Sequence, residues 1–528
     1  MVPDSVEELF HRYGPAYRWL VTVAALIGSF AMVLSATIVN VAVPSVMGAF
    51  GIGQDEAQWM ATAFLATMTA SQLLNAWVVQ AFGQRIGFGL LSVIFLIGTL
   101  LAGWAPNLDV LIIGRLLQGL AAGIVQPMTM VTIFQVFPAD RRGLAMGIYG
   151  TGVTLAPGLG PAIGGMAIDS ISWQFVFFLP LPFTVLALFM GAVFMPGKGS
   201  PVRLPPLDWP GLSALAVALF CLLTAIANGT RDGWFSDRIL LLVLIGMLGG
   251  AAFVTIQLRS RHPRLDGGLF RYPQFAQAVT GAFVFGLGNF ASSYVIPVFV
   301  QTVQGYTATR AGMVLMPAGI ALSLAMPLMG RLADFLPFHN CIIAGLVLFS
   351  IGAGMMVDAD VNTPFWMFAF FTLVGRIGMA FILPSLNAAA LKALPADQLN
   401  QGSGSMNFVR QLGGAFGVNV TVVILEYRTY FHSDVLAQTQ TAGNPTSLAW
   451  LDQVHLILGE AGIPAATQSG VALDYMSKVL HAQASTMGFQ DSFLMLTIVF
   501  ALAILPALVL ARSASPKHRP SPLKAPAE

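Results

Sequence analysis

Three arginines lie inside long stretches of apolar sequence that otherwise carry no charge: Arg115, Arg376 and Arg410. A guanidinium stays charged and is costly to bury in an apolar medium, so an intramembrane arginine indicates a functional site. No Asp or Glu lies clearly in the middle of such a stretch. A site for cations would be expected to bury a carboxylate, so these arginines favour a neutral or anionic ligand.

Polar and aromatic residues deep in the same stretches are candidates for contact with a bound molecule. For any single one, a hydrogen bond between two helices is the simpler interpretation. Gln126 precedes Pro127, and Asn387 follows shortly after Pro384, so unwound backbone there could add ligand contacts. The candidates are Asn40, Gln72, Asn75, Gln118, Gln126, Asn289, Tyr294, Gln301, Asn387 and Asn407.

Residues that could carry a proton are less well placed. Glu426 and Asp109 are expected near the outer face of the membrane, and Asp334 near the inner face. Alternatively, a protonatable ligand could carry the proton itself while Arg115 holds its anion.

These residues are positioned by segments whose composition is that of a membrane protein. Of the residues, 56% are hydrophobic and 9% charged, and a span needs about 20 apolar residues. Lipid offers no hydrogen bonds, so such long continuous runs must be helices. The sequence predicts an all-α protein with fourteen transmembrane helices near 19–47, 57–80, 86–106, 110–136, 143–168, 173–195, 209–228, 239–258, 273–303, 311–333, 340–357, 363–391, 404–426 and 492–511.

The loops between these runs predict the orientation. Most basic residues fall on one side if both termini are cytoplasmic, which satisfies the positive-inside rule. The net charge of +2 then reflects topology, and no nucleic-acid partner is expected. Cys221 and Cys341 fall within predicted helices and suggest neither a disulfide nor a metal site. No nucleotide-binding loop, catalytic triad or zinc-ligand spacing appears, so neither an enzyme nor a cofactor is expected.

An internal repeat divides the chain. "GRLLQGLAAGIVQPM" is followed by "PADRRG", and "GRIGMAFILPSLN" is followed by "PADQLN". This pattern predicts two parallel halves related by an axis along the membrane normal, with a ligand cavity between them. The predicted parts are a six-helix bundle in 1–200, an inserted helix pair in 201–262, a second six-helix bundle in 263–512 with a long extracytoplasmic loop at 428–489, and a cytoplasmic tail in 513–528.

One apolar segment, "TGVTLAPGLGPAIGG", contains five glycines and two prolines. Both residue types weaken helices in water, but a membrane tolerates them and small residues let helices approach closely. We expect a bent, tightly packed helix at the interface between the bundles, with Gly160 and Gly164 on one face. At these two glycines the backbones of the two bundles should nearly touch, so a bulky side chain there would keep one bundle from closing on the other. The residues of this motif are Gly152, Pro157, Gly160, Pro161, Gly164 and Gly165.

With these motifs, the chain resembles the major facilitator superfamily, and within it the fourteen-helix drug:proton antiporters of the QacA/EmrB type. The glycine-rich segment is similar to the family's antiporter motif, and Arg115 with Gln118 and Gly119 is similar to its helix 4 motif. Further stretches similar to family patterns follow in the expected order: "TIVNVAVP", "LDWPG", "HPRLDGGLF", "VQGYTATRAG" and "RQLGGAFG".

The resemblance implies a multi-pass protein of the plasma (inner) membrane that exports hydrophobic small molecules by alternating access. The proton gradient would drive export in place of a cofactor. Similarity to EmrB-type pumps also suggests that the loop at 428–489 contacts a periplasmic adaptor and an outer-membrane channel. A passive surface excursion is the alternative for this loop.

The chain departs from the family pattern at two places. Ser35 stands where family members usually carry Asp, and the loop between the second and third helices lacks the usual Asp. Asp334, in the second copy of that loop, is therefore expected to take a larger share of closing the cytoplasmic face. These departures would be the signature of one alternative, an uncoupled facilitator or sensor. The other alternative is an exporter of a specific metabolite such as a siderophore or fatty acid.

Overall fold

The computed structural model describes residues 5–52, 57, 59–197, 208–260, 267–441 and 443–513. Every regular element within these ranges is a helix. Eleven described helices are long and apolar enough to cross a membrane, and the shorter helix Phe338–Gly354 is also apolar. The all-α membrane class is thus confirmed, while the count of fourteen spans stays a prediction.

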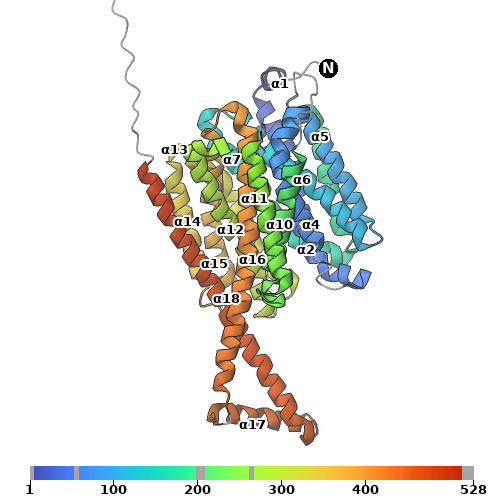
Figure 1. The fold of residues 1–528 in the computed structure, drawn as a ribbon, viewed down its shortest axis with the longest axis vertical. Helices are drawn as coiled ribbons and strands as arrows, with labels where there is room; N and C mark the ends of the chain where they lie inside the picture. Colours follow the sequence, from blue (N-terminus) through green and yellow to red (C-terminus); the bar gives the residue numbers. More distant parts are fainter. Residues whose placement is uncertain are drawn as a thin grey trace, which may run out of the picture.

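The first half of the chain forms one bundle (Figure 1). Within α5, Gly83 adopts φ 77° and ψ 172°, so the chain turns there between the second and third predicted spans. The helices of this half are α1 (Val6–Tyr13), α2 (Tyr17–Phe50), α4 (Trp59–Ser71), α5 (Asn75–Gly103), α6 (Leu108–Val136), α7 (Arg142–Ser170), α8 (Phe175–Phe178) and α9 (Leu181–Phe194).

The second half forms the other bundle. A buried aromatic cluster stabilises its centre, where Phe299 stacks on Phe368 at 5.1 Å between ring centroids and meets Phe489 and Phe493 edge-on. Its helices are α12 (Pro273–Thr302), α13 (Ala308–Phe335), α14 (Phe338–Gly354), α15 (Phe365–Lys392), α16 (Leu399–Thr439), α17 (Pro445–Glu460) and α18 (Ala465–Ser513).

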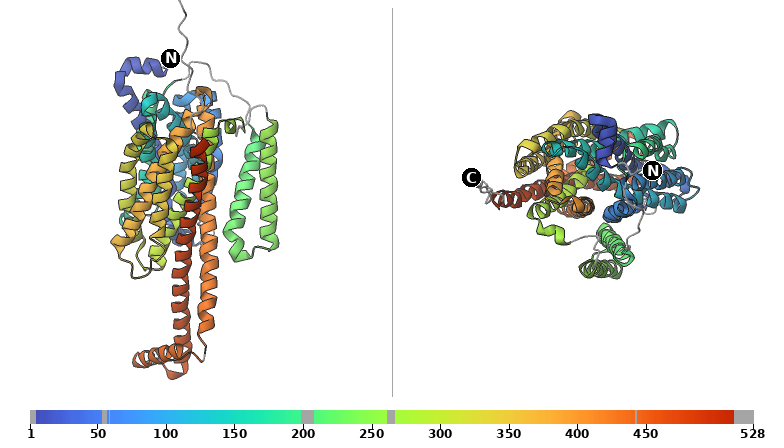
Figure 2. Two further views of the ribbon diagram at one scale, coloured as in Figure 1. Left: turned by 90° about the vertical axis from the view of Figure 1, so that its left-hand side faces the viewer. Right: turned by 90° about the horizontal axis from the view of Figure 1, so that it is seen from above.

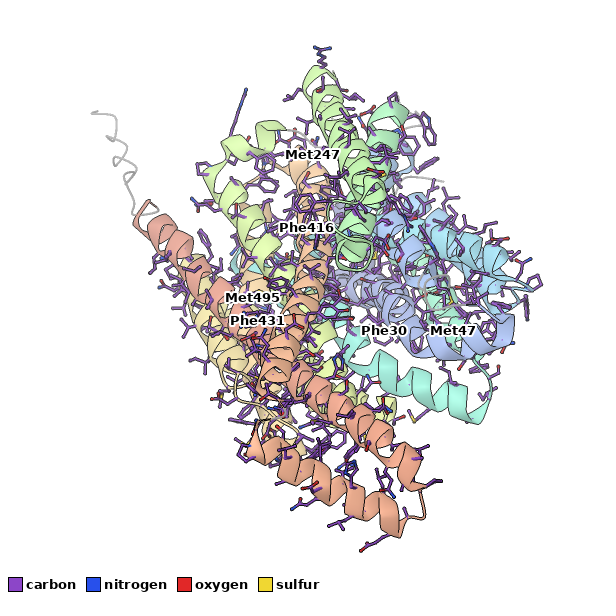
Figure 3. All side chains as sticks on the ribbon, turned by 60° about the horizontal axis from the view of Figure 1, so that its bottom comes forward. Phe30, Met47, Met247, Phe416, Phe431 and Met495 are labelled. Carbon is purple, nitrogen blue, oxygen red and sulfur yellow. The ribbon has the colours of Figure 1, made fainter. Side chains whose placement is uncertain are left out.

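The helices α10 (Trp209–Asp232) and α11 (Asp237–Arg259) occupy the residues predicted to form an inserted pair. They lie side by side on the outside of the bundles (Figure 2). Trp59 of α4 stacks on Phe220 of α10 at 5.3 Å. Apolar side chains of α11, among them Met247 (Figure 3), remain exposed, as expected for a surface that faces lipid. Most of the proline-rich and basic segments that flank this pair lie outside the described residues, as does most of the tail at 513–528.

Two helices of the second half continue well beyond the bundles. The helix α16 has 41 residues, about 60 Å at 1.5 Å per residue, which is twice the thickness of a bilayer core. α18 runs beside it, and α17 lies across the far tip (Figure 1). The predicted long loop at 428–489 is therefore a helical extension, in agreement with the helix-like spacing of its sequence.

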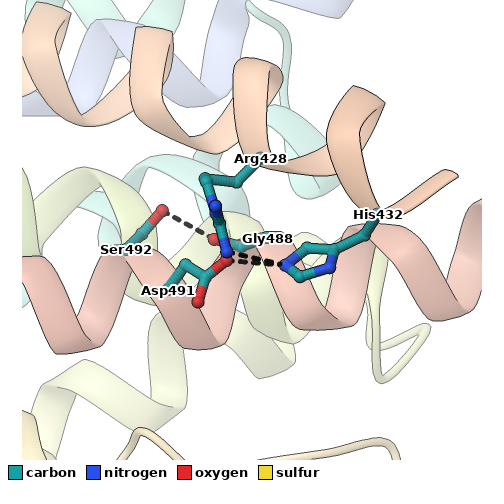
Figure 4. A network of polar contacts seen from close by, with 5 residues as sticks. All are labelled: Arg428, His432, Gly488, Asp491 and Ser492. Atoms are coloured by element: carbon teal, nitrogen blue, oxygen red, sulfur yellow. Dashed lines mark hydrogen bonds and ion pairs between the residues drawn. The ribbon is translucent and has the colours of Figure 1, made fainter. Parts of the chain in front are cut away.

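A polar network joins the two helices of the extension at its base (Figure 4). Asp491 of α18 accepts hydrogen bonds from Arg428 Nε and His432 Nε2 of α16. The helices are also close here, because a Cβ on Gly488 would collide with Thr429 Oγ1. This network joins α16 and α18 where the extension leaves the bundle.

We predict that Asp491→Asn loosens the base of the extension, because Arg428 and His432 then lose their anionic partner. Hydrogen bonds to charged groups contribute about 1.5–3 kcal/mol each. Amide exchange at 428–436 and 484–491 should therefore become at least tenfold faster. Asp474→Asn is the matched control, since Asp474 pairs only with Lys478 of its own helix among the contacts described for it. Equal exchange in the two variants would contradict the assignment.

Candidate functional site

The helices α7 and α13 bring the two halves into contact, and glycines allow their backbones to meet. A Cβ added to Gly158 of α7 would lie 3.2 Å from the Cα of Gly319 in α13. A Cβ on Gly147 would overlap the Met326 carbonyl oxygen. Backbone contact of this kind is possible only with small residues. The glycine-rich helix therefore lies at the interface between the bundles, as its sequence predicts.

The two glycines that were expected to make this contact face elsewhere. A Cβ on Gly160 would lie 2.8 Å from Thr37 Oγ1, and a Cβ on Gly164 would lie 2.6 Å from Ile38 Cγ1, both in α2 of the same bundle. The expectation for Gly160 and Gly164 is therefore wrong: Gly158 makes the contact between bundles. Gly152 packs on Leu26 of α2 in the same way, so the motif has two packing faces.

The remaining motif residues occupy the same continuous helix. Gly165 is buried and Pro157 is half-buried. The side chain of Pro161 lies outside the described residues.

Asp334 closes one end of this interface. Its Oδ1 accepts a hydrogen bond from Gly143 N at 2.6 Å, and its Oδ2 accepts one from Leu144 N at 3.0 Å. Both amides belong to the first turn of α7, where free N–H groups and the helix dipole favour an anion. Lys392 Nζ lies 3.3 Å from Oδ1. A carboxylate of the second half thus caps a helix of the first half, at the place where the sequence predicted a closing contact.

The corresponding loop of the first half makes no such contact through Gln84. Gln84 Nε2 donates to Gln135 Oε1 at 3.3 Å, within its own bundle.

A second line of contact joins the start of α16 to the first bundle. Asn75 Nδ2 donates to the Asn400 carbonyl oxygen at 2.9 Å and to Ser403 Oγ at 3.2 Å. A Cβ on Gly404 would lie 2.7 Å from the Gln72 carbonyl oxygen. Further along, Asn407 Nδ2 lies 3.4 Å from Met130 Sδ.

The polar contacts described between the halves fall on the first parts of α7 and α16, and the glycine packing of α7 on α13 continues to Gly158. Both helices begin at a Pro-Ala-Asp loop, Pro138–Asp140 and Pro395–Asp397, and we call this end of the molecule the Pro-Ala-Asp end. Deeper along α7, Thr151 Oγ1 donates to the Ser323 carbonyl oxygen at 2.9 Å. The halves are therefore closed against each other at the Pro-Ala-Asp end.

Arg115 is fully buried and bonded entirely within the first bundle. Its Nη1 donates to Ser35 Oγ at 2.9 Å and to Gln118 Oε1 at 2.7 Å, and its Nε donates to the Met60 carbonyl oxygen at 3.0 Å. The guanidinium also lies 4.2 Å from the centre of the Phe64 ring. Ser35, the residue in place of the family's Asp, is thus a partner of Arg115, which the sequence did not indicate.

Arg376 makes the equivalent contacts within the second bundle. Its Nη1 donates to Asn289 Oδ1 at 2.7 Å, and its Nη2 donates to Ser293 Oγ at 2.8 Å. A cavity of about 20 Å³ beside it, lined also by Ser292 and Thr372, has room for about one water molecule. Arg115 and Arg376 occupy equivalent places in the repeat: Arg115 ties α6 to α2 and α4, and Arg376 ties α15 to α12.

Arg410 differs from both, because it lies at the interface between the bundles. Its side chain is 5% exposed. Nη2 donates to Asn407 Oδ1, while Nη1 has no hydrogen-bond partner among the described residues. The hydroxyl of Tyr149, on α7 of the other half, lies close enough to Arg410 for electrostatic interaction. Sequence reasoning did not find Tyr149, since nothing sets it apart from other aromatic residues in apolar runs.

The other candidate residues do not gather in a single cavity. Asn387 is fully buried with both amide atoms unpaired, and Gln126 Oε1 is also unpaired, in the described part of the chain. Gln301 is exposed and bonds only to its own helix among its described contacts. Tyr294 is partly exposed and lies near the exposed Glu426. The side chain of Asn40 lies outside the described residues.

Two helical bundles that close on each other around buried polar groups are the architecture of a membrane transporter. The family model described as Major Facilitator Superfamily matches residues 25–418. The chain belongs to this superfamily, so it is a multi-pass transporter of the plasma (inner) membrane rather than an enzyme.

Similar proteins agree with the resemblance to QacA/EmrB-type exporters. The multidrug export protein EmrB of Haemophilus influenzae is 27% identical over 475 residues, which cover 89% of this chain and 90% of that protein. The lincomycin resistance protein LmrB of Listeria innocua is 28% identical over 400 residues, covering 76% and 85%. The crystal structure of the human organic anion transporter MFSD10 shares the fold with a TM-score of 0.57 at 12% identity, covering 92% of this chain and 99% of that one.

We predict that Asp334→Ala opens the Pro-Ala-Asp end, because the first turn of α7 loses its carboxylate cap. Two hydrogen bonds to a charged group correspond to a shift of the closed population on the order of ten- to a hundredfold. The distance between spin labels at the exposed positions Ala139 and Arg331 should lengthen and broaden. Asp140→Ala is the matched control, since the Asp140 side chain is 73% exposed. An unchanged distance distribution in Asp334→Ala would refute the capping role.

Proposed function

We propose that this protein is a secondary active exporter that uses the proton gradient to move hydrophobic small molecules, neutral or anionic, by alternating access. The observation that carries this proposal is the interface between the two bundles. Its described polar contacts lie towards the Pro-Ala-Asp end and include the cap by Asp334, while Gly147 and Gly158 pack against α13 along the interface. Such an interface can separate and re-form without unfolding either bundle.

The proposed topology has fourteen transmembrane helices, with both termini and the Pro-Ala-Asp end in the cytoplasm. Each predicted span overlaps helical residues of the structure, although 57–80 is divided between α4 and the start of α5, and 173–195 between α8 and α9. With this topology the structure corresponds to a state closed towards the cytoplasm.

Hydrophobic compounds are proposed as substrates because the similar proteins are named as a multidrug export protein, EmrB, and a lincomycin resistance protein, LmrB. The preference for neutral or anionic compounds rests on the charges of the interior. The described ion pairs leave Arg115, Arg376 and Arg410 without a carboxylate partner. A cation would therefore meet no compensating charge near these groups.

One observation favours a second candidate, an uncoupled facilitator or sensor. Ser35 bonds to Arg115 where the family usually has a carboxylate that can exchange a proton. A protonatable substrate would restore coupling without that carboxylate. Export of a specific metabolite, such as a siderophore or fatty acid, is a narrower form of the same function.

The helical extension at 428–489 gives the protein a surface far from the bilayer. We propose that it contacts a periplasmic adaptor leading to an outer-membrane channel. The reason is the length of α16 and α18 together with the similarity to EmrB.

Growth inhibition and vesicle assays test the function. Cells that express the protein should tolerate a panel of hydrophobic antibacterial compounds better than cells with an empty vector, and a protonophore should remove this advantage. In proteoliposomes, an imposed pH gradient should drive uptake of the same compounds. Movement that does not depend on the gradient would establish the facilitator instead, and no movement of any compound would refute both.

A further inference from the structure

We propose that Arg410 and Tyr149 form a binding site for the anionic group of an organic substrate, at the interface between the two bundles. This assignment deepens the proposed export function and rests on it. It separates Arg410 from the other two buried arginines, which the sequence alone treats alike.

The hydrogen bonds of the three arginines carry the distinction. Arg115 donates to three residues of its own bundle and leaves only Nη2 unpaired among the described contacts, and Arg376 donates to the side-chain oxygens of two residues of its own bundle. Arg410 has one acceptor, Asn407 Oδ1, which fixes its guanidinium through Nη2 and leaves Nη1 free among the described contacts. A buried charged donor without an acceptor is costly, so its retention needs a reason.

The second donor comes from the opposite half. The Tyr149 hydroxyl is fully buried and lies beside the Arg410 guanidinium. Its oxygen can accept from the guanidinium, whereas its proton has no acceptor among the described residues. The Tyr149 O–H and the Arg410 guanidinium therefore remain available as donors to a bound ligand. An oxyanion such as a carboxylate or phenolate can accept from both at once.

The position of this pair suits a transported ligand. Arg410 lies eleven residues after the first residue of α16, about 17 Å along the helix axis, near the middle of a bilayer core about 30 Å thick. Alignment of Pro138 with Pro395 places Arg410 opposite Val153 in the repeat. The first bundle thus has no equivalent arginine, and the site exists once per molecule.

The two donors also explain how binding would affect the conformation. Tyr149 belongs to α7 and Arg410 to α16, so an anion that accepts from both ties the bundles together. Bound anion would then favour the state closed at the Pro-Ala-Asp end. Its release would accompany the separation of the bundles at that end.

Binding of two probes of matched shape tests the assignment: 2-naphthoate, an anion, and 2-naphthamide, its neutral amide. Both are titrated calorimetrically into the full-length protein in lipid nanodiscs, and the measured quantity is the ratio of their affinities. The wild-type protein should prefer the anion. Arg410→Gln should remove that preference through a loss on the order of a hundredfold in anion affinity. Tyr149→Phe should lower it roughly fivefold.

Two further variants keep the test decisive. Arg410→Lys keeps the positive charge but loses the guanidinium, so it should keep part of the preference for the anion. Partial preference in this variant shows that a substitution at position 410 leaves a folded protein that still binds the probes. Arg376→Gln is the matched control, because Asn289 and Ser293 already accept from that guanidinium, and its affinity ratio should equal that of the wild type. Thermal unfolding of each variant checks its integrity.

A wild type with equal affinity for both probes, or an Arg410→Gln variant that keeps the preference, would overturn the anion site. Either result leaves the proposed export function standing if efflux persists. Loss of all efflux in the wild type, by contrast, would defeat the proposed function.

Discussion

The constraint on which this structure depends is that a guanidinium inside a membrane protein needs hydrogen-bond acceptors from the protein itself. Arg115 and Arg376 meet it in the same way: each is held by side chains of the helix that begins its own bundle, through Ser35 in α2 and through Asn289 in α12. These bonds make each bundle a rigid unit. Rigid bundles move as bodies, so any change of access must occur at the interface between them.

That interface combines two kinds of contact: short-range van der Waals packing and a directional, charge-assisted hydrogen bond. Glycine pairs such as Gly158 and Gly319 bring the backbones together through van der Waals packing, which falls off within a short distance. Asp334 adds a directional charge-assisted cap at the Pro-Ala-Asp end. Loss of the cap would free the first turn of α7, and the packed pairs would then have little to keep them in register. A few groups near one end can therefore govern the separation of two large bodies.

Much of the fold follows from the sequence because each transmembrane span can be recognised from its own run of apolar residues. Uncharged apolar runs are helices wherever lipid surrounds them, and Asp334 lies in the last turn of α13, opposite the first turn of α7. The contacts between helices are harder to predict. Periodicity places Gly160 and Gly164 on one face, but which neighbour that face meets depends on the packing of the whole bundle, and here it is α2. Ser35 interacts with Arg115, and Tyr149 with Arg410, across long distances in the chain. The sequence alone therefore does not mark Ser35 and Tyr149 as parts of these sites.

A disulfide across the interface tests most directly whether separation of the bundles is required for transport. Cysteines replace Thr154 of α7 and Ser323 of α13, whose hydroxyl oxygens lie 3.3 Å apart, in a protein whose buried Cys221 and Cys341 have been changed to serine. Efflux is then measured before and after oxidation and again after reduction. The account predicts that oxidation stops efflux and that reduction restores it. Full efflux with the disulfide formed in every molecule would contradict it.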